Sequence, residues 1–133
     1  MKDIVLDKIL SVGNEEIDRD HRILIDLFNN LNHSVTEGAG PDYLAAILEE
    51  LINCTVWHFS HEDRLMLKYG YGEMEDHRVE HQELIKTARE LQQEILHAEK
   101  SVSDQDIVLL ERWLTEHILT YDMRLGAYLS QVM

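Results

Sequence analysis

The stretch Trp57-His58-Phe59-Ser60-His61-Glu62 places His58 four residues before Glu62, and the next polar segment places His77 four residues before His81. On a helix, side chains four residues apart lie one above the other on the same face. Each pair can therefore reach one point in space. Imidazole nitrogen and carboxylate oxygen are ligands that suit iron, zinc or manganese. The spacing predicts two helices that direct metal ligands at each other.

Length and composition limit the class of protein. A chain of 133 residues with 44% hydrophobic residues suits one globular domain. The net charge of -14 argues against nucleic acid or an anionic membrane as a partner, because both require a cationic surface. Cys54 is the only cysteine, which excludes an intramolecular disulfide and a thiolate metal cluster. Residues 1–20 are acidic and contain no long apolar run, so we expect no signal peptide or membrane span, and a cytoplasmic location.

Apolar residues recur at steps of three and four along four segments, which predicts four amphipathic helices. The glycines at 38–40, the segment Tyr69–Gly72 and a polar connection at 99–103 separate these segments. Ser103 or Asp104 is a suitable N-cap for the last helix.

Four helices joined by short connections are typical of an all-α, up-down-up-down antiparallel four-helix bundle. We expect residues 1–133 to form a single domain, in which residues 15–133 make the bundle. We expect residues 1–14 to form a short N-terminal arm whose apolar side chains pack against the helices.

In such a bundle the start of the first helix, the end of the second, the start of the third and the C-terminal half of the fourth lie near one end. Seven potential metal ligands fall at this level of the predicted core. They are His21, His58, Glu62, His77, His81, His117 and Asp122. A buried polar group without a partner costs roughly 1 to 3 kcal/mol. Because seven such groups would destabilise the core, the pattern predicts a bound metal.

The pair in the last helix has a different spacing from the others. Five residues of α-helix turn about 500°, which leaves the side chains of His117 and Asp122 roughly 140° apart. We therefore expect them to flank a centre of two ions and not to lie stacked beside one ion. Five imidazoles and two carboxylates also exceed what one four-coordinate zinc can use, so two ions bridged by Glu62 and Asp122 account for all seven.

The chain resembles the hemerythrin family along nearly its whole length. The motifs that carry the resemblance are Val12-Gly13, Ile17-Asp18-x-x-His21, His58-Phe59-x-x-Glu62 followed by Met66, Tyr71, His77-x-x-x-His81 and Trp113-Leu114-x-x-His117-Ile118-x-x-x-Asp122. Bacterial members often carry a Trp-acidic pair in the arm, where this chain has Leu6-Asp7. That difference concerns the arm and leaves the seven metal ligands unchanged.

The resemblance implies reversible dioxygen binding, for storage, delivery or sensing, at two non-haem irons bridged by Glu62, Asp122 and an oxo or hydroxo group. It implies that one iron takes the histidines at 77, 81 and 117, and that the other takes those at 21 and 58. The latter iron then has the open position, which would accept dioxygen, nitric oxide or a small anion such as azide. An apolar pocket beside it would be lined by Phe59, Trp113, Leu114, Ile118 and Leu24.

Two other functions use the same residues. A di-iron oxidase, peroxidase or nitric oxide-handling enzyme would have a polar side chain within reach of the open position. A bundle that uses metal only as a structural clip would unfold without it and leave no position open. His61 lies one turn from His58 and could support a metal ligand without binding the metal itself, but an exposed or edge position is expected.

Overall fold

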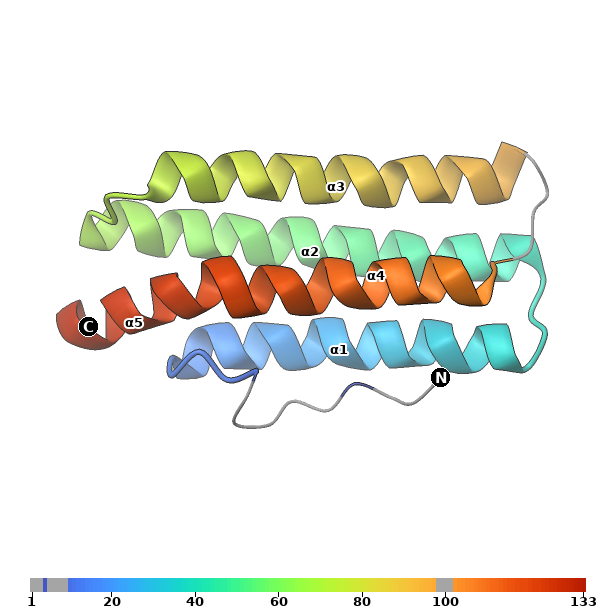
Figure 1. Ribbon diagram of the computed structural model, residues 1–133, viewed down its shortest axis with the longest axis horizontal. Helices are drawn as coiled ribbons and strands as arrows, with labels where there is room; N and C mark the ends of the chain where they lie inside the picture. The colour runs from blue at the N-terminus through green and yellow to red at the C-terminus, as the bar shows by residue number, and fades with distance from the viewer. Residues whose placement is uncertain (1–3, 5–9, 98–101) are drawn as a thin grey trace.

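The computed structural model describes residue 4 and residues 10–97 and 102–133. All regular elements in these residues are helices, which lie side by side along the long axis (Figure 1). They are α1 (Glu15–Thr36), α2 (Pro41–Tyr69), α3 (Met74–His97), α4 (Asp104–His117), the π-helix η1 (Ile118–Asp122) and α5 (Met123–Val132). Because α4, η1 and α5 follow one another as a single rod, the predicted antiparallel four-helix bundle is confirmed (Figure 1).

Local sequence signals fix where the helices begin and end. The side chain of Asn14 accepts a hydrogen bond from the Ile17 N–H and caps α1. Ser103, one of the two predicted caps, forms a capping box with Asp106 at the start of α4. Gly70 ends α2 in the left-handed conformation with φ 66°, which glycine adopts without steric cost.

The alternation of helix direction brings four helix segments to one end of the bundle. The start of α1, the end of α2, the start of α3 and the η1–α5 segment all lie at the left in Figure 1. Each helix turns an apolar face inward, and these faces form the core of the bundle. No helix among the described residues is long and apolar enough to cross a membrane.

The described part of the N-terminal arm is held against α1 and α5. The backbone of Ile4 exchanges two hydrogen bonds with the Asn29 side chain, at 2.9 and 2.8 Å. The Val12 N–H donates to Asp18 Oδ1 at 2.9 Å. Val12 also packs directly on the backbone of Gly126 in α5. Two features of the sequence, the Leu6-Asp7 pair and residues 99–101 of the polar connection, lie outside the described residues.

Gly126 provides a test of this packing. A Cβ atom at Gly126 would lie 2.1 Å from the Val12 carbonyl oxygen and 2.8 Å from Val12 Cβ. We expect Gly126→Ala to lower the free energy of unfolding by about 1 to 3 kcal/mol, because overpacking exceeds the gain in helix propensity of about 1 kcal/mol. Gly40→Ala is the control, since no heavy atom lies within 4 Å of that Cβ position. Chemical denaturation measures both, and equal stability of the two variants would contradict the packing.

Candidate metal centre

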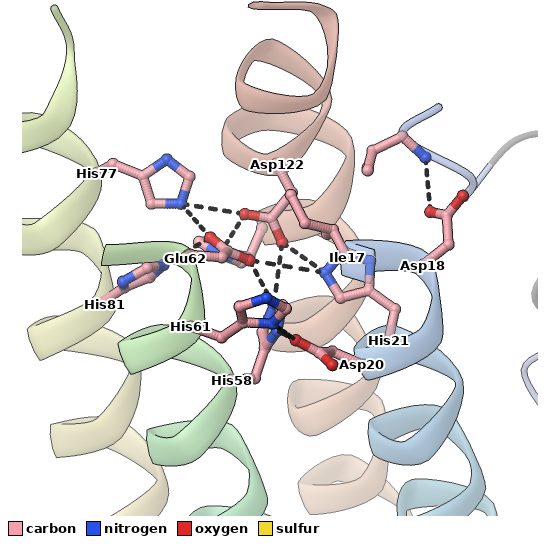
Figure 2. Close-up of polar contacts among 12 residues, drawn as sticks. Ile17, Asp18, Asp20, His21, His58, His61, Glu62, His77, His81 and Asp122 are labelled. Atoms are coloured by element: carbon pink, nitrogen blue, oxygen red, sulfur yellow. Dashed lines mark hydrogen bonds and ion pairs between the residues drawn. The ribbon is translucent and has the colours of Figure 1, made fainter. Parts of the chain in front are cut away.

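The seven predicted metal ligands converge at the end of the bundle where the four helix segments meet. The six that Figure 2 labels point at one another between the helices, and Nε2 of His117 lies 3.0 Å from Asp122 Oδ1. None is more than 5% exposed. They are His21, His58, Glu62, His77, His81, His117 and Asp122. The structure therefore brings together every residue that the sequence singled out as a metal ligand.

The ligand atoms form two groups that share both carboxylates. One group contains Glu62, His77, His81, His117 and Asp122, and the other contains His21, His58, Glu62 and Asp122. Within each group the ligand atoms lie within 4.8 Å of one another. Two ions placed in these groups would have Glu62 and Asp122 between them.

The carboxylates reach both groups with different oxygens. Nε2 of His77 lies 2.7 Å from Glu62 Oε1 and 3.1 Å from Asp122 Oδ1. On the other side, Nε2 of His21 lies 2.8 Å from Asp122 Oδ2, and Nε2 of His58 contacts Glu62 Oε2. Each carboxylate therefore presents one oxygen to each side, which is the arrangement that a bridging ligand requires.

The expected separation of His117 and Asp122 by 140° is wrong. Nε2 of His117 lies 3.0 Å from Asp122 Oδ1. The reason is η1, in which the Met123 N–H bonds to the Ile118 carbonyl five residues earlier. A π-helical turn takes up more residues than the 3.6 of an α-helix, so residues five apart come to lie nearly one above the other.

Several buried atoms of the centre face one another in close ion pairs, but the described residues give none of them a hydrogen bond of regular geometry. They are Nε2 of His58, His81 and His117, Oε2 of Glu62 and Oδ1 of Asp122. Leaving such an atom unsatisfied costs about 1 to 3 kcal/mol. Imidazole nitrogens and carboxylate oxygens are ligands for iron, manganese and zinc, and these atoms converge. The residues therefore fit a metal centre.

Comparison with known proteins gives the same assignment. Residues 12–129 match the family model described as the hemerythrin HHE cation binding domain. The chain belongs to the hemerythrin family. It is 31% identical over 122 residues to a bacteriohemerythrin of Pseudomonas aeruginosa, a match that covers 92% of this chain and 78% of the relative. A hemerythrin-like protein of Naegleria gruberi is 29% identical over 118 residues, which cover 89% of this chain and 87% of that protein.

A solved structure also matches. The chain superimposes on a crystal structure of wild-type hemerythrin with a TM-score of 0.86 and 26% identity. The match covers 96% of this chain and 98% of the other. The family assignment that the motifs indicated is confirmed.

In this hemerythrin-family chain, the two shared carboxylates are anionic. Burial and the charge of Asp122 raise the pKa of Glu62, but the charge and close contact of His58 and the hydrogen bond with His77 outweigh them and hold this pKa well below its ordinary value. Burial likewise raises the pKa of Asp122, but the charge and close contact of His117 outweigh burial and hold that pKa well below its ordinary value too. The centre therefore holds two buried negative charges, which favour the binding of cations.

The histidines respond to the carboxylates in different ways. Burial lowers the pKa of His77, but hydrogen bonds to Asp122 and Glu62 outweigh it and raise the pKa to about 9. Burial also lowers the pKa of His58, which the charge of Glu62 raises well above the ordinary value. At His81 burial dominates and lowers the pKa. Protons on His58 and His77 thus occupy places that a metal would take.

Sequence reasoning missed Asp20. Its Oδ2 accepts hydrogen bonds from Nδ1 of His58 at 2.8 Å and from Nδ1 of His61 at 2.5 Å (Figure 2). Burial raises the pKa of Asp20, but these two hydrogen bonds outweigh it and lower the pKa. His61, predicted at an exposed or edge position, is half-buried because Asp20 holds it. A histidine that binds a metal through one ring nitrogen needs a hydrogen-bond partner for the other nitrogen. This requirement is the signal from which a partner such as Asp20 could have been predicted.

A small cavity lies beside the ligands of the second group. Its lining contains all five residues predicted for the apolar pocket: Leu24, Phe59, Trp113, Leu114 and Ile118. Thr55 and Leu84 also line it and were not predicted. The space available to the centre of a water-sized molecule is about 10 Å³, enough for one such molecule.

Asp20 is expected to orient His58 toward the metal. Asp20→Asn keeps the size of the side chain and removes its charge, so metal binding at the group containing His21 and His58 should weaken by about 10- to 100-fold. The other group should be affected less. The matched control is Asp18→Asn, because Asp18 faces the arm and binds the Val12 N–H (Figure 2). Metal titration of both variants measures the difference, and an equal loss in both would refute the role of Asp20.

Metal binding should also depend on pH. A metal binds neutral imidazole, so it must displace the protons of His58 and His77. The pKa of His77 is about 9, and the pKa of His58 is raised well above its ordinary value. We therefore expect the apparent affinity for zinc to rise from pH 7 to about pH 9 and then to level off. Competition with a chelator at a series of pH values, corrected for the chelator's own protonation, measures this. A flat profile over that interval would contradict the assignment of protons.

Proposed function

We propose that this chain binds dioxygen reversibly at a carboxylate-bridged di-iron centre that also contains a bridging oxo or hydroxo group. The single observation that carries the proposal is that two groups of buried ligands share Glu62 and Asp122 beside an apolar cavity. Such a site suits storage, delivery or sensing of dioxygen. Nitric oxide and small anions such as azide are further ligands for the same position.

The proposed division of ligands follows the two groups. His77, His81 and His117 would hold one iron, and His21 and His58 the other, with both carboxylates shared. The second iron would then have one protein ligand fewer and an open position. The cavity supports this division, because both His21 and His58 line it, whereas of the other three histidines only His117 does.

The protein's contribution is to exclude water and withhold protons from the cavity. Trp113 Nε1 donates its hydrogen to the Leu84 carbonyl at 2.8 Å, so it is not available to a ligand. Paired ferrous irons, when bound, would supply the electrons that dioxygen takes up and returns. A dry cavity without a free acid favours release of dioxygen over cleavage of its O–O bond.

The hydroxyl of Thr55 is the observation that raises a second candidate function, that of an oxidase, peroxidase or nitric oxide-handling enzyme. This hydroxyl is the polar side chain in the cavity lining that is neither a metal ligand nor an indole. Thr55 Oγ1 donates to the Leu51 carbonyl at 2.6 Å, which keeps its proton from a ligand. The hydrogen bond therefore favours reversible binding, and Thr55→Val provides the test: an enzyme that uses this proton would lose turnover.

The proposal predicts a definite metal content and gas response. Protein reconstituted with ferrous iron should hold two irons per chain and change absorbance reversibly between air and argon. A single tightly bound zinc, or steady turnover with a reductant, would refute reversible dioxygen binding.

The ligand variants serve as internal controls for that experiment. His58→Ala should empty the iron beside the cavity first, whereas His117→Ala should mainly affect the other iron. His58→Ala should therefore abolish the gas response even when the chain has lost less of its total iron than the His117→Ala variant. If both variants keep the response, the division of ligands is wrong.

A further inference from the structure

A small molecule that reaches the cavity must pass between the side chains of its wall. Of the residues that line the cavity, all except Leu84 are buried. Four of them, His21, His58, His117 and Asp122, belong to the metal centre. An access route therefore requires an apolar wall residue that can move and that has open space behind it.

A surface groove between α2 and α3, here called the α2–α3 groove, lies on the other side of one such residue. Val56 and Ser60 on α2 and Gln82 and Ile85 on α3 line it, and its volume is about 360 Å³. The buried ring of Phe59 also lines it. Among the residues described as lining these two spaces, Phe59 is the one that they share.

The contacts of Phe59 allow its ring to move. The ring stacks on the imidazole of His81, with centroids 3.6 Å apart and planes 5° from parallel. Its centroid lies 5.5 Å from that of His117 and 5.9 Å from that of His58. Because the phenyl ring makes no hydrogen bond, rotation about its side-chain bonds breaks only apolar contacts. Phe59 is buried but is not a member of the continuous apolar core.

Another groove among the described residues also meets the cavity. It lies between α1 and α2, and its lining includes Ile23, Cys54, Trp57 and the cavity residue Leu24. Leu24 is 2% exposed and belongs to the continuous core, whereas Phe59 is 7% exposed and does not. Moving Leu24 would disturb close-packed neighbours, which makes it the less suitable gate.

We propose that small ligands enter the cavity from the α2–α3 groove and that the ring of Phe59 is the gate. The proposal deepens the proposed function, on which it rests for the identity of the ligand as dioxygen. The route itself depends only on the two spaces and the side chain between them. A gate of this kind sets the size of molecule that is admitted and the rate of its passage.

The fluorescence of a tryptophan in the cavity wall can report the arrival of small molecules in the cavity. The chain has two tryptophans, of which Trp113 lines the cavity and Trp57 is 59% exposed. In a Trp57→Phe background, quenching of Trp113 fluorescence by dissolved dioxygen measures passage without any reaction at iron. The full-length chain is loaded with zinc for this purpose, because zinc has no redox chemistry.

Substitution by phenylalanine in each of the two grooves tests the two routes. Ser60→Phe fills the α2–α3 groove, and Cys54→Phe fills the groove between α1 and α2. We expect Ser60→Phe to lower the quenching rate constant several-fold, Cys54→Phe to leave it unchanged, and Phe59→Leu to raise it several-fold. No effect of Ser60→Phe, or a decrease with Cys54→Phe alone, would overturn the proposal. Ser60 is exposed, so this variant tests the route even if a change at Phe59 impairs folding.

Azide binding to the iron-loaded chain gives a second measurement. For a gate, Ser60→Phe should slow association and dissociation by the same factor and leave the Kd unchanged. A changed Kd at equal association rate would instead make the groove part of the ligand site and overturn its role as a passage. If azide fails to bind while the quenching results hold, the proposed function fails and the access route stands.

Discussion

The burial of seven polar side chains at one level of the bundle is the constraint on which the rest of the structure depends. Carboxylates and imidazoles in an apolar core are costly unless each finds a partner. In this fold they contact one another, but the Nε2 atoms of His58, His81 and His117 make no hydrogen bond of regular geometry among the described residues. Two cations would satisfy these atoms and offset the buried negative charges of Glu62 and Asp122.

Helix geometry supplies the ligands in two ways. In α2 and α3 the ordinary α-helical repeat stacks residues four apart, and this brings His58 to Glu62 and His77 to His81. In the last rod a π-helical turn stacks residues five apart. The added residue lets His117 and Asp122 approach the same space. A local departure from the α-helix thus completes the centre without changing the bundle.

The surroundings of the ligands divide the centre into unequal halves. Asp20 holds the outer nitrogen of His58, and the cavity opens beside His58 and His21. Of the three histidines in the other half, only His117 lines the cavity, and Phe59 covers the ring of His81. This asymmetry is what the proposed function uses to separate the position for a small ligand from the position that would only hold a metal. It also makes Phe59 part of both the cavity wall and the surface groove.

The sequence by itself determined the four helices, their order and the seven residues that could act as metal ligands. Helix periodicity and caps are local, and antiparallel connections fix which helix ends meet. Only the tertiary structure decided the π-turn at η1, the pairing of Asp20 with His58 and the place of Phe59 between two spaces. Asp20 and His58 are 38 residues apart, so their contact depends on how α1 and α2 pack against each other. Local spacing cannot specify that register, because it arises from the fit of side chains across the whole interface between helices.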